Sequence, residues 1–179
     1  MHIEQTFIPG LKLIHLNEFK DNRGSFIKVF NEDFFHENGL ETDIKESYFS
    51  ISAKNVIRGM HFQIPPAEHT KLVYVNQGSI LDVVLDIRKN AETYGKFFSY
   101  KITQENPTLV FIPAGCAHGF LSLEDQTMVT YLQSSVYNKA CDTGILWNSF
   151  GMEWKIENPI ISDRDDSFIK FKNFNSYFS

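Results

Sequence analysis

A histidine, a lysine and an aspartate occur within apolar segments that are typical of buried β-strands. His61 lies in Arg-Gly-Met-His-Phe-Gln, Lys71 opens Lys-Leu-Val, and Asp82 opens Asp-Val-Val-Leu-Asp-Ile-Arg. Charged groups among apolar strands are costly unless they are paired or used in a site. A base, a cation and an acid that face one cavity can remove a proton from the carbon beside a carbonyl group. The three residues therefore indicate acid–base chemistry on a carbonyl compound.

Each of these groups has a candidate role in such a reaction. Histidine titrates near neutral pH, so His61 is a candidate general base. Lys71 is the candidate cation beside the enolate oxygen, and Asp82 on the next predicted strand would hold it in place. A plain cross-strand ion pair between Lys71 and Asp82 is the alternative.

Inversion of a carbon atom also needs an acid on the opposite face of the substrate. Tyr131 and Tyr137 lie six positions apart in one apolar run. If that run is a single strand, both side chains share one of its faces, and either can serve as the acid. The alternative is that both are ordinary aromatic residues of a β core.

The segment Pro-Ala-Gly-Cys-Ala-His, which ends at His118, resembles the second sequence motif of the cupins. In metal-binding cupins the first motif supplies two histidines as His-x-His, together with a glutamate. Here the corresponding place reads His61-Phe62-Gln63, so one ligand is missing. Glu68 and His69 are possible substitutes, but they do not complete an evident ligand set. We therefore predict no metal site.

The composition is that of an ordinary globular protein. Its 179 residues suit one domain, which we take as residues 1–179. The net charge of −5 argues against a nucleic-acid partner, although it leaves room for a local basic pocket that binds a phosphorylated ligand. Because the sequence shows no signal peptide and no apolar run of about 18 residues, we expect a cytoplasmic protein with no membrane partner. Cys116 and Cys141 fit no metal or redox spacing and are expected to be free thiols.

Short apolar or alternating runs, separated by Gly, Pro and Asn, predict an all-β fold of the sandwich or barrel type. We expect a hairpin turn at Asn76–Ser79 and one helix at Asn31–Asn38, which Gly39 ends. The polar and aromatic tail from Ser162 should wrap the surface or cap the mouth of a barrel. Examples of the candidate strands are Leu11–Leu16, Gly24–Phe30, Tyr48–Ala53, Lys71–Asn76, Ser79–Ile87, Phe97–Thr103, Leu109–Ile112 and Thr127–Val136.

The order of the motifs along the chain resembles that of a known enzyme family. The series comprises Arg-Gly-x-His-Phe-Gln, Lys-Leu-Val, Asp-Val-x-x-Asp-Ile-Arg, Ile-Pro-x-Gly-x-x-His-Gly-Phe, the paired tyrosines, Gly-Ile-Leu-Trp and Ser-Asp-Arg-Asp. From about Asp21 to Asp165, it resembles the dTDP-4-dehydrorhamnose 3,5-epimerase family of nucleotide-sugar enzymes. The resemblance implies a cupin-type jelly roll (a double-stranded β-helix) with short flanking helices. It also implies a cofactor-free isomerase, a homodimer and a role in deoxysugar or surface-polysaccharide synthesis.

The resemblance also implies a role for each matching residue. His61 resembles the base that removes protons from sugar carbons 3 and 5, and Asp165 the carboxylate that orients it. Lys71 resembles the stabiliser of the enolate, supported by Asp82, and Tyr131 the acid on the other face. The remaining matches resemble parts of the substrate-binding set: Arg23 and Arg58 for the diphosphate, with Arg23 donated by the partner subunit; Phe26 for stacking on the base; and Ser50, Gln63, His118, Tyr137, Asp142 and Arg164 elsewhere in the pocket.

Two departures from the family pattern leave the nucleotide open. Lys28 stands where the family usually has a glutamate, and Glu46 and Tyr48 stand where it often has Gln and Asn. A carboxylate at position 46 matches the adjacent N–H donors of guanine, with Lys28 near an acceptor of the base. A GDP-linked 4-keto hexose or heptose is therefore a rival to a dTDP-linked substrate. A surface ion pair between Lys28 and Glu46 is the alternative, and the number of inverted carbons stays open.

Three other functions compete with an epimerase. A nucleotide-sugar ketoisomerase also uses histidines in a jelly roll, but the tyrosine pair, Lys71 and Asp165 favour epimerisation. A metal-dependent cupin oxygenase would need the metal ligands that the sequence lacks. A sugar-binding cupin without activity would not need the set of His61, Lys71, Tyr131 and Asp165.

Overall fold

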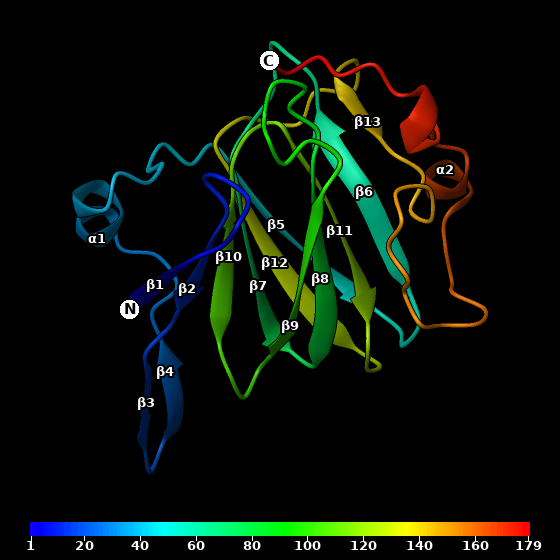
Figure 1. Cartoon of the computed structure of the whole chain (residues 1–179). Helices are drawn as coiled ribbons and strands as arrows, with labels where there is room; N and C mark the ends of the chain where they lie inside the picture. The colour runs from blue at the N-terminus through cyan, green and yellow to red at the C-terminus, as the bar shows by residue number, and fades with distance from the viewer.

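The computed structural model describes residues 1–179, and most of its regular structure is antiparallel β-sheet arranged as two facing layers (Figure 1). The six-stranded sheet has the order β1 (His2–Gln5), β2 (Lys12–His15), β10 (Thr108–Ile112), β7 (Lys71–Gln77), β12 (Thr127–Gln133) and β5 (Glu46–Ser52). The five-stranded sheet has the order β13 (Asp142–Gly144), β6 (Ile57–Gln63), β11 (Cys116–Ser122), β8 (Ser79–Asp86) and β9 (Phe97–Thr103). The predicted all-β jelly roll is confirmed.

Apolar side chains fill three layers. Between the sheets, Val73 and Val129 meet Val84 and Phe120. The outer face of the six-stranded sheet is covered by α1 (Glu32–Glu37), whose Phe35 is fully buried. The six-stranded sheet is therefore packed with apolar side chains on both of its faces.

The C-terminal segment covers the outer face of the five-stranded sheet. It contains α2 (Asp163–Asp166) and a 3-10 turn, η1 (Phe171–Asn173). Phe174 and Phe178 pack edge-on against Phe62 of β6, at centroid distances of 5.5 and 6.0 Å. This packing holds α2 beside β6, so that a side chain of α2 can reach one on β6.

Most local predictions hold, with some differences at the ends of elements. The predicted strand Phe97–Thr103 matches β9. Helix α1 lies within the predicted helix: the Asn31 side chain caps its start by accepting a hydrogen bond from the Phe34 amide (2.8 Å), and Gly39 follows its end with φ +65°. The predicted strand Thr127–Val136 ends earlier, at Gln133. The short strands β1, β3 (Glu18–Asp21) and β13 were not predicted, because three or four residues carry too little pattern.

The predicted hairpin at Asn76–Ser79 is wrong. Gly78 does turn the chain, with φ +79° against Thr127, but β7 and β8 on either side of it belong to different sheets. The turn therefore carries the chain from one layer to the other. Neighbours along the sequence at this point are not neighbours in a sheet.

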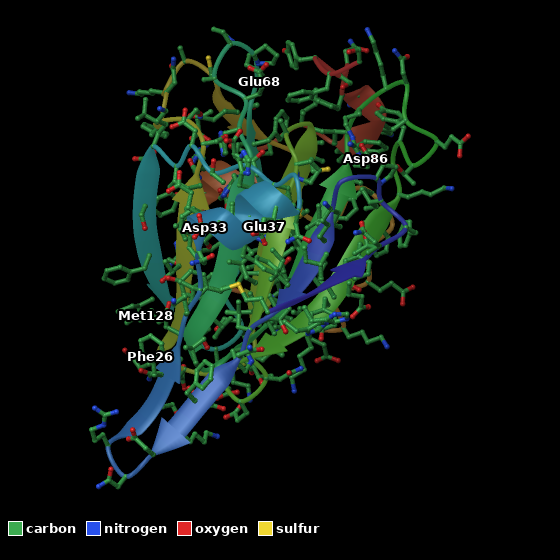
Figure 2. All side chains as sticks on the ribbon, turned by 90° about the vertical axis from the view of Figure 1, so that its left-hand side faces the viewer. Phe26, Asp33, Glu37, Glu68, Asp86 and Met128 are labelled. Atoms are coloured by element: carbon green, nitrogen blue, oxygen red, sulfur yellow. The ribbon has the colours of Figure 1, made fainter.

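One hairpin extends away from the two layers (Figures 1 and 2). It consists of β3 and β4 (Gly24–Ile27) and forms its own two-stranded sheet. The side chains of Phe19 and Phe26 on this hairpin are 60% and 61% exposed. No helix of the chain is long and apolar enough to cross a membrane.

Candidate active site

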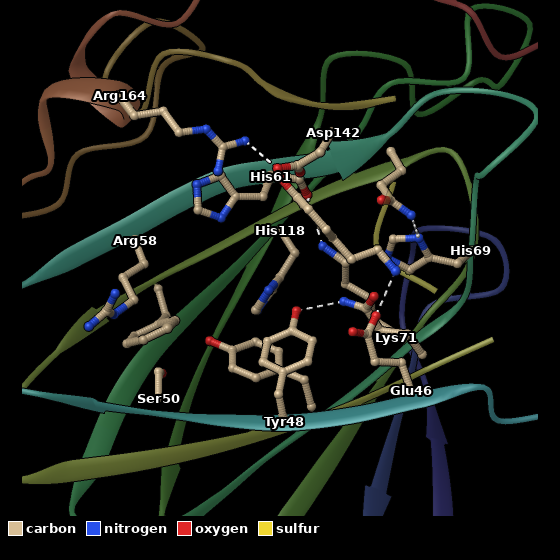
Figure 3. A pocket seen from close by; sticks show the side chains of 15 residues that line it. Glu46, Tyr48, Ser50, Arg58, His61, His69, Lys71, His118, Asp142 and Arg164 are labelled. Atoms are coloured by element: carbon tan, nitrogen blue, oxygen red, sulfur yellow. Dashed lines mark hydrogen bonds and ion pairs between the residues drawn. The ribbon is translucent and has the colours of Figure 1, made fainter. Parts of the chain in front are cut away.

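The two sheets enclose an open cavity of about 370 Å³, which is the candidate active site (Figure 3). Its walls come from β6 and β11 on one side and from β5, β7 and β12 on the other. Most of the lining residues are polar, and they include many predicted site residues, namely Glu46, Ser50, Arg58, His61, Gln63, Lys71, His118, Tyr131, Tyr137, Asp142 and Arg164. The fold thus brings together side chains that are far apart in the sequence.

His61 and Asp165 form the predicted pair. His61 Nε2 lies 2.8 Å from Asp165 Oδ1, and the other carboxylate oxygen accepts a hydrogen bond from the Gly59 amide at 3.0 Å. Asp165 is held in turn by Ser162, whose side chain caps α2 and accepts from the Asp165 amide. Burial works against the charge of Asp165, but these hydrogen bonds outweigh it and lower the pKa of the carboxyl. The histidine is therefore oriented by a carboxylate that stays ionised.

Tyr131 faces the cavity from the opposite sheet. Its side chain is buried, and its ring stacks on Tyr48 at a centroid distance of 4.8 Å. Burial raises the pKa of the Tyr131 hydroxyl, which keeps the phenol protonated near neutral pH. The Tyr48 hydroxyl accepts a hydrogen bond from Gln133 Nε2 at 2.6 Å, which fixes the stacking partner in turn. A histidine on one sheet and a protonated phenol on the other are the arrangement that inversion requires.

Lys71 is buried in the wall of the cavity. Its Nζ donates a hydrogen bond to the His61 carbonyl oxygen at 3.2 Å. Burial lowers the pKa of Lys71 to about 8, and the charge of Asp142 opposes that change. The charged ammonium form of Lys71 is therefore less favourable than that of an exposed lysine, and it lies beside His61.

The predicted support of Lys71 by Asp82 is wrong. Asp82 Oδ2 lies 2.6 Å from His118 Nε2, and both side chains are buried. The reason is the change of sheet at Gly78: Lys71 lies on β7 of one sheet and Asp82 on β8 of the other, where its register partners are Phe120 and Tyr100. Because His118 pairs with His61 in register, two His–Asp pairs lie on neighbouring strands.

Arg58 and Arg164 supply positive charge at the cavity. Arg58 donates from Nε to Ser52 Oγ at 3.0 Å. Arg164 pairs with Asp142 at 2.6 Å, and its guanidinium lies 5.2 Å from the ring centroid of Phe168. Both arginines also line an adjoining cavity that reaches Asp165. Two exposed arginines that line both cavities suit a diphosphate.

The prediction that Tyr131 and Tyr137 share one face of a single strand is wrong. Because β12 ends at Gln133, Tyr137 lies beyond the strand and is 57% exposed. It still lines the cavity, and its amide donates to Glu46 Oε2 at 2.7 Å. Gln63 also has a fixed place, since its Oε1 accepts from the Asn138 amide at 2.6 Å.

Five predicted residues do not line this cavity: Asp82 and Asp165, which pair with the histidines that do, and three residues near the N-terminus. Arg23 pairs with Asp21 at the end of the exposed hairpin, and Phe26 lies on the same hairpin. Lys28 lies in a separate depression with Phe19 and Asn31. Within one chain, Lys28 therefore does not meet Glu46, and neither of the two predicted arrangements of that pair is formed.

Sequence reasoning missed other residues that line the cavity, among them His69, Phe120 and Gln133. Gln133 carried a usable signal, because it follows Tyr131 at a spacing of two on one strand and so shares its face. His69 was weighed only as a metal ligand. No group of three or more His, Cys, Asp or Glu side chains is arranged to hold a metal ion.

Comparisons with known proteins agree with this geometry. A family model described as dTDP-4-dehydrorhamnose 3,5-epimerase matches residues 5–173. Proteins of that name from Shigella flexneri and Methanothermobacter thermautotrophicus are 37% and 40% identical, over 96% and 90% of this chain and 96% and 89% of their own. A crystal structure of the Bacillus anthracis protein of that name, with TDP and PPi bound, is 33% identical and superposes with a TM-score of 0.91, over 94% of this chain and 98% of that one. The chain therefore belongs to the dTDP-4-dehydrorhamnose 3,5-epimerase family, and it is an isomerase that acts on a sugar nucleotide.

Proposed function

We propose that this protein epimerises a dTDP-linked 4-keto-6-deoxy sugar at carbons 3 and 5, with residues 1–179 as one catalytic domain. The observation that carries the proposal is the placement of base and acid. The His61–Asp165 pair lies on the five-stranded side of the cavity and the buried Tyr131 phenol on the six-stranded side. A sugar ring held between them presents one face to each group. No cofactor takes part in the proposed reaction.

The reaction is a proton transfer through an enolate. Asp165 accepts a hydrogen bond from His61 Nε2–H, so the Nδ1 lone pair is the one that takes the proton from carbon 3 or carbon 5. The negative charge moves to the oxygen at carbon 4, where the Lys71 ammonium stabilises it. Tyr131 then gives its proton to the opposite face of the same carbon. His61 releases its proton to solvent and Tyr131 regains one, which restores the enzyme.

The choice of dTDP rests on the relatives, which are named for dTDP-linked substrates. The pairing that favoured guanine is not supported within one chain, because Lys28 lies outside the cavity and the Glu46 carboxylate already accepts from the Tyr137 amide. Arg58 and Arg164 are proposed to bind the diphosphate. A GDP-linked 4-keto sugar is the rival that binding measurements must exclude.

We further propose a cytoplasmic homodimer in which the β3–β4 hairpin completes the partner's site. The hairpin carries Arg23 and the exposed Phe26 away from its own cavity. Strand β5 is one of the two edge strands of the six-stranded sheet, and Phe49 and Ile51 on it are 61% and 47% exposed. An unpaired edge with exposed apolar side chains is typical of a surface that another chain covers.

Solvent exchange tests the reaction directly. The protein is incubated in heavy water with dTDP-4-keto-6-deoxyglucose and, separately, with a GDP-linked 4-keto sugar, and NMR locates the deuterium. We expect uptake at carbons 3 and 5 of the dTDP sugar, and a loss of roughly 10²- to 10⁴-fold in rate for His61→Asn and Tyr131→Phe. His36→Asn, an exposed residue of α1, is the matched control. Exchange at carbon 3 alone would restrict the reaction to one centre, and wild-type exchange in His61→Asn would exclude His61 as the base.

A further inference from the structure

His69 has an unpartnered polar atom in the wall of the cavity. It lies two residues before Lys71 at the start of β7 and is only 8% exposed. Figure 3 shows His69 beside Lys71, on the same side of the cavity. Its Nε2 is shielded from bulk water and has no hydrogen-bond partner within the chain. A buried polar atom without a partner costs free energy, so its presence in a binding cavity points to a ligand.

The hydrogen bonds of the other ring nitrogen determine what His69 offers. The Gln63 amide is oriented by the Asn138 amide, which donates to Oε1, so Nε2 of Gln63 is a donor and faces His69 Nδ1 at 3.1 Å. Nδ1 also lies 3.2 Å from the Ala67 carbonyl oxygen, but that oxygen already accepts from Gln63 at 2.9 Å and from Ser135 at 2.9 Å, and these two bonds use both of its lone pairs. From this network we assign the acceptor role to His69 Nδ1 and the ring proton to Nε2.

The ring is also neutral. Burial lowers the pKa of His69 to about 4, and the positive charge of Lys71 acts in the same direction. At neutral pH the side chain thus presents one uncharged N–H donor, held in place by Gln63, beside the ammonium of Lys71. Such a donor suits an oxygen acceptor and gives no hydrogen bond to an ammonium group or to a methylene group.

We propose that His69 Nε2–H donates a hydrogen bond to an oxygen of the sugar ring that binds beside Lys71, and so selects sugars that carry oxygen at that position. This inference rests on the proposed function. The sugar, rather than the nucleotide, is the partner because His69 shares its wall with Lys71, whereas Arg58 and Arg164 lie at the opening that suits the diphosphate.

Two variants separate the donor from the packing of the ring. In His69→Asn the side-chain amide lies where Nδ1 was, so the variant has no donor in the place of Nε2–H. In His69→Gln the longer side chain brings its amide to the place of Nε2, so a donor is retained there. Isothermal titration calorimetry measures the affinity of each variant, of wild type and of His36→Asn for dTDP and for dTDP-glucose, which adds only the sugar. Circular dichroism shows whether each variant is folded.

We expect His69→Asn to bind dTDP-glucose about 2- to 12-fold more weakly and dTDP unchanged, with much of the loss restored in His69→Gln. Equal loss for both ligands would overturn the assignment to the sugar. No loss for either, or loss in both variants alike, would show that His69 only packs. If wild type binds neither ligand, the titration is repeated with GDP and GDP-mannose. Binding of these two ligands alone would overturn the dTDP assignment. The His69 variants would then be compared with GDP and GDP-mannose, by the same criteria. Failure to bind any of the four would overturn both proposals.

Discussion

At the scale of single residues, the charge on Lys71 is the property of the site most sensitive to its surroundings. Its pKa is lowered to about 8 by burial, and Asp142 opposes this change. Because the enolate is stabilised by the ammonium and not by the amine, we expect kcat to fall as pH rises through about 8. In Asp142→Asn the opposing charge is gone, so the fall should begin at a lower pH. A pH–rate profile of both proteins measures this, and identical alkaline limbs would remove Lys71 from the reaction.

Asp165 is the residue through which His61 is oriented. One carboxylate oxygen accepts a hydrogen bond from His61 Nε2–H, and the other accepts one from the Gly59 amide. Asp165→Asn keeps the size of the side chain but no longer fixes the tautomer of His61, so we expect kcat to fall by roughly 10²- to 10⁴-fold. Affinity for dTDP should change little, because Asp165 lies behind the histidine. Single-turnover exchange in heavy water and calorimetry with dTDP separate the two effects.

At the scale of elements, the close approach of β6 and β11 sets the geometry of both His–Asp pairs. Gly59 has φ +133°, and a Cβ there would lie 2.5 Å from Gly119 Cα and 2.9 Å from the His118 carbonyl oxygen. Gly59→Ala must therefore push the strands apart, move His61 and His118, and cost on the order of 1–3 kcal/mol of unfolding free energy. Urea denaturation and an exchange assay measure the two losses.

Gly151 provides the matched control for that variant. It also has a positive φ, +90°, but nothing lies within 4 Å of a Cβ built there. Gly151→Ala should show backbone strain without the clash, hence a smaller loss of stability and normal activity. Equal loss of activity in both variants would mean that strain, and not the strand spacing, accounts for the effect.

At the scale of the whole molecule, the β3–β4 hairpin and the cavity belong to different parts of one chain. If Arg23 acts in the partner's site, His61→Asn and Arg23→Ala subunits should complement each other. A mixed dimer then has one site with both lesions and one intact site, so random mixing restores about a quarter of wild-type activity. Each variant is assayed alone and after mixing under mild denaturation. No recovery, with mixed dimers shown by mass spectrometry, would place Arg23 outside the partner's site.

The sequence by itself determined the β class and most of the residues that meet in the cavity. Local pattern was enough for β9, for the helix that Asn31 caps, and for the apolar runs, because these depend on neighbours along the chain. Residue chemistry was enough to select His61 and Lys71 and to offer Tyr131 beside Tyr137, since ionisable groups in apolar surroundings are rare without a use. Asp165 was selected only through the family resemblance.

Only the tertiary structure decided how those residues pair. The chain changes sheet at Gly78, so Asp82 meets His118 and not Lys71, and β12 ends before Tyr137. The unpartnered nitrogen of His69 likewise depends on Gln63 and Asn138, which are distant in sequence from each other. A pattern of apolar residues determines which face of a strand is buried, but not which other strand that face will meet. The packing of the two sheets decides which strands meet, and so which charged side chains lie close enough to pair.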